Sequence, residues 1–109
     1  MKAETLQKVL SSLGLCCKAG KGIAGTEQVC EALRKQKTLL IVFYPCDVSE
    51  NTRKKLTDKC AFYGVALTEL PTSGDALAHA VGKSGFCAAY GVTDKNFAAL
   101  LCGITAQDP

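Results

Sequence analysis

The chain has 109 residues and a net charge of +3, from 13 lysines and arginines against 10 aspartates and glutamates. This length favours a single domain that buries a core without disulfide support, and no apolar run approaches the roughly 20 residues of a membrane span. Glu4 and Gln7 interrupt the charged-then-apolar layout of a signal peptide, so we expect a cytoplasmic protein.

Helical and extended patterns alternate from the start of the chain. Apolar residues at helical spacing predict a first helix that passes Gly14 and ends near Lys18. The stretch 21–24 is a short strand candidate, and the second helix that follows it is capped at Gly25 or Thr26. The inward positions of these two helices are Leu6, Val9, Leu10, Leu13, Val29, Ala32 and Leu33.

The continuous apolar run at 38–44 is typical of a central strand covered on both faces. A third helix follows, capped by Asp47 or Ser49 and stopped by Gly64. Its expected buried stripe is Leu56, Cys60 and Tyr63. Its basic residues lie largely opposite that stripe and are interpreted as a solvated face. They are Arg53, Lys54, Lys55 and Lys59.

The last third predicts a strand at 65–70, a short helix capped by Ser73, a buried strand at 86–92 and a final helix capped by Thr93. The inward residues of the final helix are expected to be Phe97, Leu100 and Leu101. Helices and strands thus alternate over short connections throughout. This pattern predicts an α/β fold, a small sheet sandwiched between helical layers, in one domain spanning residues 1–109.

The sequence offers little for catalysis or metal binding. Its seven cysteines include no C-x-x-C pair and are expected to be mostly small buried hydrophobes. Cys46, before a helix start, is the best nucleophile candidate, but a cysteine phosphatase loop needs arginine six positions on, where Thr52 stands. His79, the single histidine, has no identifiable partner. We therefore predict no catalytic residue, no metal and no cofactor.

Four stretches in their order and spacing resemble the kink-turn-binding ribosomal protein superfamily, and within it the small bacterial YlxQ-type paralogues. They are LGLCCKAGKGIAGTEQVCEALRKQKTLLIVF (13–43), SENTRKKLTDKC (49–60), ALAHAVGK (76–83) and VTDKNFAALL (92–101). The resemblance covers residues 6–101. It implies a three-layer α/β/α sandwich with a small mixed four-stranded sheet, and a non-enzymatic protein that binds sharply bent double-stranded RNA.

In that superfamily, RNA meets the N-terminus of the second helix and the loop after the fourth. The corresponding candidate RNA-binding residues here are Lys18, Lys21, Gly25, Thr26, Glu27, Gln28, Glu31, Lys83, Ser84, Gly85 and Phe86. Residues 1–37 hold seven bases and three acids, so a basic face should come mostly from this third. Phe86 can stack on a base if it is exposed. Its place in the strand pattern at 86–92 instead favours a core position.

The second helix departs from the RNA-binding pattern at two positions. Family members commonly read Gly-Thr-Asn-Glu-Val-x-Lys, whereas Glu27 and Glu31 stand here in place of the asparagine and the lysine. Carboxylates in the first turns complement the helix dipole by about 0.3–1 kcal/mol each, and Glu31 can pair with Lys35 one turn on. Losing a phosphate contact and adding repulsion costs more, about 1–2 kcal/mol.

Two hypotheses therefore stand. The first is a ribosome- or translation-associated protein that binds structured, kink-turn-like RNA, ribosomal RNA included. The second is a protein-interaction module on the same scaffold, in which Glu27 and Glu31 face a basic ribosomal or translation-factor protein. Under both we expect a monomer with no membrane partner.

Overall fold

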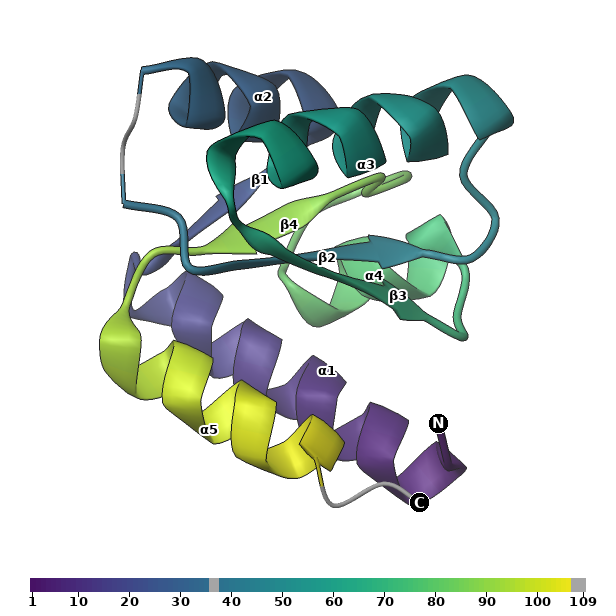
Figure 1. Cartoon of the computed structure of the whole chain (residues 1–109). Coiled ribbons are helices and arrows are strands. Elements are labelled where there is room, and N and C mark those ends of the chain that lie inside the picture. Colours follow the sequence, from purple (N-terminus) through teal and green to yellow (C-terminus); the bar gives the residue numbers. More distant parts are fainter. Residues whose placement is uncertain (36–37, 107–109) are drawn as a thin grey trace.

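The computed structural model of the chain describes residues 1–35 and 38–106. A four-stranded sheet lies between two helical layers, with α2 and α3 on one face and α1, α4 and α5 on the other (Figure 1). The elements are α1 (Ala3–Lys18), β1 (Gly22–Ala24), α2 (Thr26–Arg34), β2 (Ile41–Pro45), α3 (Glu50–Tyr63), β3 (Ala66–Leu70), α4 (Gly74–Ala80), β4 (Tyr90–Val92) and α5 (Lys95–Ala106). The predicted α/β/α sandwich is confirmed.

The sheet is mixed, with the strand order β1-β4-β2-β3. Strand β2 pairs in parallel with β3 and antiparallel with β4, which in turn pairs antiparallel with β1. Along β2, Ile41 and Phe43 pack into the layer of α1, α4 and α5, whereas Val42 and Tyr44 pack against α2 and α3. Because both faces of β2 are covered, its sequence is apolar throughout rather than alternating.

Local capping signals set the starts of α3 and α4 as the sequence predicts. The Ser49 hydroxyl accepts a 3.2 Å hydrogen bond from the Thr52 amide, and the Ser73 hydroxyl accepts one of 3.1 Å from the Ala76 amide. Gly64 ends α3 in the left-handed region, at a φ of 69°. These helix starts and this helix end depend on a few adjacent residues, so they can be predicted from the sequence.

The C-terminal part differs from the prediction in three places. The expected strand at 86–92 is shortened to β4 at Tyr90–Val92. Asp94, rather than Thr93, caps α5 by accepting a 3.0 Å hydrogen bond from the Phe97 amide, because the Thr93 hydroxyl donates instead to the Lys21 carbonyl. Leu100 does not face inward, since its exposed fraction is 48%, and the inner face of α5 instead includes Ala98 and Leu101.

Most of the cysteines are buried as expected. Cys16, Cys30, Cys60 and Cys87 lie in the interior, Cys17 is half-buried, and all seven are free thiols. Burial raises the pKa of Cys60 to about 11 and also raises that of the other three buried thiols, so these groups stay protonated at neutral pH. Across the described ranges, none of the helices combines the length and the apolar character needed to cross a membrane.

Candidate nucleic-acid interface

The start of α2 is shaped by a glycine that no other residue replaces without strain. Gly25, the N-cap, has a φ of 103° and a ψ of 142°, and the helix has no side-chain cap. Its carbonyl accepts a 2.9 Å hydrogen bond from the Val29 amide. A Cβ at Gly25 would overlap the side-chain amide oxygen of Gln28, which lies over the cap. The first turn of α2 thus begins without a side-chain hydrogen bond to its N-cap, and the side-chain amide of Gln28 lies over Gly25.

Both carboxylates of this helix start are neutralised by cations. Glu31 forms ion pairs of 2.7 Å with Arg34 and 3.2 Å with Lys35, which confirms the expected pairing one turn on and adds a second partner. The hydrogen bonds from Arg34 and Lys35 hold the pKa of Glu31 below its ordinary value. Glu27 pairs at 2.9 Å with Lys55, which reaches across from α3. Three cations therefore accompany two carboxylates.

An open hollow of about 560 Å³ lies beside these groups, lined by residues of β1 and α2. The lining residues are Ile23, Glu27, Gln28, Glu31 and Ala32. Thr26, at the first position of α2, is half-buried. Three of the side chains predicted for this site, Glu27, Gln28 and Glu31, therefore share one surface depression.

The loop between α4 and β4 is joined directly to this helix start. The Gly25 amide donates a 2.8 Å hydrogen bond to the Ala89 carbonyl, at the end of the loop 82–89. Its first part closes α4 through the Lys83 amide, which donates to the Ala78 carbonyl at 2.8 Å. The side chains that the sequence assigned to RNA, Lys83, Ser84, Gly85 and Phe86, are all exposed. The structure therefore brings the loop and the α2 start, more than fifty residues apart in sequence, into one neighbourhood.

The core position expected for Phe86 is wrong. Its exposed fraction is 51%, and one side of its ring lies against Gly74, where a Cβ would overlap the ring. The reason is that the backbone around it bonds to helix starts rather than to a strand: the Cys87 amide donates to the Gly74 carbonyl at 3.0 Å. A half-exposed ring held from one side leaves its other side available for stacking.

The two lysines before β1 and in α1 lie differently. Lys21 is exposed beside β1, and its carbonyl accepts hydrogen bonds of 2.9 Å from both the amide and the hydroxyl of Thr93, which fixes its backbone. Lys18 lines a separate hollow of about 720 Å³ between α1 and α4, on which no residue of α2 borders. The structure thus places Lys21 just before β1, the strand that leads into α2, and Lys18 in a separate depression.

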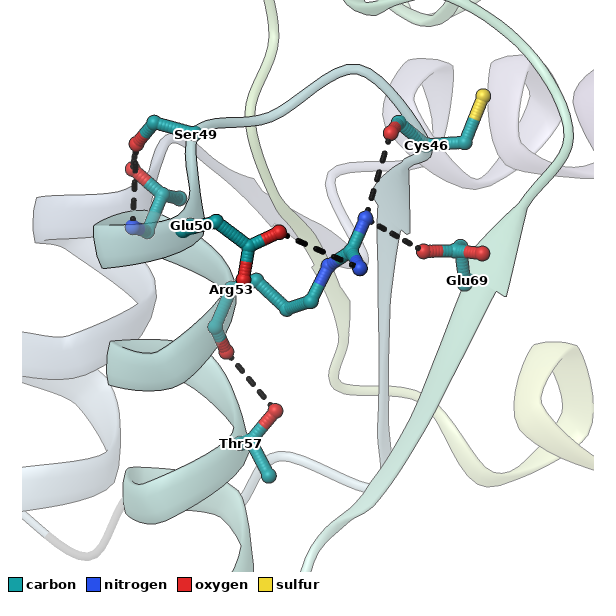
Figure 2. A network of polar contacts seen from close by, with 7 residues as sticks. Cys46, Ser49, Glu50, Arg53, Thr57 and Glu69 are labelled. Carbon is teal, nitrogen blue, oxygen red and sulfur yellow. Dashed lines mark hydrogen bonds and ion pairs between the residues drawn. The ribbon is translucent and has the colours of Figure 1, made fainter.

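Two of the four basic residues of α3, Arg53 and Lys55, have more specific partners than a solvated face requires, whereas Lys54 and Lys59 are exposed as expected. Figure 2 shows Arg53 pointing away from α3 toward β3, where its guanidinium lies 3.2 Å from Glu69 and donates to the Cys46 carbonyl at 3.4 Å. Glu50 lies 3.7 Å from the same guanidinium. Arg53 therefore ties α3 to the edge strand, and Lys55 ties it to α2. The ion pair between Lys55 and Glu27 was not predicted from the sequence, because no local pattern links these two residues.

The rejected catalytic candidates gain no support from their surroundings. The Cys46 thiol is exposed and lies 3.4 Å from the Thr72 carbonyl, and Cys46 stands beside Arg53 only through its own backbone carbonyl. His79 is exposed on α4 and borders the hollow that holds Lys18. Across the described ranges, no cluster of histidine, cysteine, aspartate and glutamate is arranged to hold a metal ion.

The α/β/α sandwich, with a helix start that has no side-chain cap beside an exposed loop, defines the class of protein as a small α/β domain. The particular family is clear, because the model of the ribosomal protein L7Ae/L30e/S12e/Gadd45 family matches residues 7–102. The chain belongs to that family.

Relatives and solved structures agree with this assignment. The RNA-binding protein YlxQ of Enterococcus faecium is 37% identical over 98 residues, covering 90% of this chain and 91% of the relative. The RNA-binding protein YlxQ of Bacillus subtilis (strain 168) is 34% identical over 86 residues, covering 79% and 83%. A protein of unknown function from Bacillus halodurans superposes with a TM-score of 0.82 at 31% identity, covering 92% of this chain and 98% of the other. The Giardia lamblia 15.5kD RNA binding protein shares the fold, with a TM-score of 0.79 at 14% identity, covering 98% and 89%.

Proposed function

We propose that this chain is a non-enzymatic RNA-binding protein of the translation apparatus, which recognises bent, kink-turn-like RNA through the first turn of α2 and the loop 82–89. The observation that carries the proposal is the hydrogen bond from the Gly25 amide to the Ala89 carbonyl, which brings the end of this loop beside the N-cap of α2. Membership of a ribosomal protein family supports it, as does the similarity to two YlxQ relatives that are named RNA-binding proteins.

The physical basis is the helix start itself. Free amides and the partial positive charge of a helix N-terminus suit phosphates and the acceptor edges of bases. Regular RNA helices hide their deep groove from protein, and a sharp bend opens it. Gly25 has no side chain, so RNA backbone can approach the cap closely once the Gln28 side-chain amide moves aside. Because Glu27 and Glu31 are each paired with cations, their repulsion of phosphate is reduced.

We expect the protein to bind a standard kink-turn RNA and to bind a matched straight duplex more weakly. Affinity should fall steeply with salt, with the logarithm of the binding constant losing about 0.7–0.9 per logarithmic unit of salt for each phosphate contact. Gel-shift titrations of both RNAs at two salt concentrations measure this. Equal affinity for the bent and the straight RNA would contradict kink-turn recognition, and no RNA binding at all would favour the protein-interaction module.

Replacing Glu31 with lysine should tighten binding to the kink-turn RNA by about tenfold at low salt, because it removes one charge that repels phosphate and adds one that attracts it. The matched control is Glu4→Lys, which makes the same charge change at an exposed position in the first turn of α1, in the other helical layer. The control should change affinity far less. Equal gains from both variants would mean that net charge, rather than the α2 start, governs binding.

A further inference from the structure

The most exposed large apolar side chain of the described residues lies on α3, outside the surface discussed so far. Phe62 has an exposed fraction of 80%. Its ring lies edge-to-face against that of Tyr63, with 4.9 Å between centroids and an interplanar angle of 78°. Such a contact holds the ring in a preferred orientation and leaves most of its surface exposed. An aromatic ring is therefore presented to solvent on a rigid helix.

Two lysines share a helical stripe with this ring. Lys55, Lys59 and Phe62 follow one another at spacings of four and three residues, so they lie on the same side of α3. They line an open hollow of about 480 Å³ together with Asp58 and Tyr63. Seven residues of helix place Phe62 about 10 Å along the axis from Lys55.

The stripe begins at the candidate RNA surface. The Lys55 ammonium lies 2.9 Å from the Glu27 carboxylate in the first turn of α2. The hydrogen bond to Glu27 raises the pKa of Lys55 above its ordinary value, so it stays charged. An RNA strand that runs from the α2 start along α3 would meet the ammonium groups of Lys55 and Lys59 and then the exposed ring of Phe62.

We infer that the stripe Lys55–Lys59–Phe62 binds a single-stranded segment of the same RNA, with the lysines contacting phosphates and a base stacking on Phe62. This inference rests on the proposed function. An exposed ring beside lysines matches the general design of single-strand binding surfaces, whereas a protein interface usually has a wider contiguous apolar patch. The Asp58 carboxylate in the same hollow can accept hydrogen bonds from the exocyclic amino groups of bases.

The test uses two probes, a kink-turn RNA with blunt stems and the same RNA carrying a short single-stranded extension. Wild-type protein should bind the extended RNA about tenfold more tightly, as one stacked base contributes. Phe62→Ala and Phe62→Leu should both remove this gain and leave the affinity for the blunt RNA unchanged, whereas Phe62→Tyr should keep it. Lys59→Gln should lower the salt dependence for the extended RNA only. Lys54→Gln, an exposed neighbour outside the hollow, is its control.

The outcomes separate this inference from the function on which it rests. If wild-type protein binds both probes equally, the α3 stripe does not contact RNA, although the proposed function stands. If Phe62→Leu keeps the gain in affinity for the extended RNA, base stacking is overturned, because leucine has no aromatic face. That result would indicate a nonspecific apolar contact with the extension instead. If wild-type protein binds neither probe, the proposed function fails. Leu15→Ala, at an exposed apolar position on α1, controls for general effects of losing surface apolar area.

Discussion

Phe43→Ala should lower the free energy of unfolding by about 3–5 kcal/mol, as expected for removing a large buried aromatic side chain. Phe43 is fully buried at the centre of β2 and packs into the core formed with α1, α4 and α5. A loss of that size is a large fraction of the 5–15 kcal/mol that typically stabilises a domain. Denaturant titration followed by circular dichroism measures it.

Phe62→Ala is the matched control, because it makes the same substitution where the ring is 80% exposed. It should cost no more than about 1 kcal/mol, the worth of the edge-to-face contact with Tyr63. The two variants thus separate stability from binding: Phe43→Ala should destabilise the fold, and Phe62→Ala should change only the interaction with extended RNA. Comparable losses of stability would contradict the placement of Phe43 in the core.

Gly25→Ala should lower the free energy of unfolding by about 1–3 kcal/mol, because a side chain at a φ of 103° strains the backbone. It should also weaken binding to the kink-turn RNA by about tenfold, equivalent to one lost contact of about 1.4 kcal/mol, since the methyl group occupies the surface that RNA approaches. Thermal unfolding and gel-shift titration measure the two effects separately.

Gly103→Ala in α5 is the control, and it should act with the opposite sign. No atom lies within 4 Å of a Cβ placed at Gly103, so alanine should raise stability by about 0.5–1 kcal/mol through its better helix propensity. A double variant, Gly25→Ala with Gln28→Ala, removes the overlap with the Gln28 amide but keeps the backbone strain. Full recovery of stability in the double variant would show that overlap, rather than strain, limits this position.

The sequence predicts only part of the candidate site. Gly25 and the loop residues were singled out by resemblance, and Glu31 was expected to pair with Lys35, because that pairing follows helical spacing. The partner of Glu27 was missed, since Lys55 belongs to another helix. Phe86 can stack on a base if exposed, but the strand pattern favours a core position, because an apolar run looks the same whether it forms a strand or a half-covered loop; the ring is in fact half-exposed.

Periodicity, caps and glycine stops were sufficient to determine the alternation of helices and strands, the doubly covered central strand β2 and the starts of α3 and α4. These features depend on neighbouring residues, so the chain carries them locally. Tertiary structure alone decided the length of β4, the exposure of Phe86 and the contact of Lys55 with Glu27. Each of these features depends on backbone groups or charges that are distant in the sequence. Such groups come together only when the helical layers and the sheet have assembled, so no short stretch of sequence predicts them.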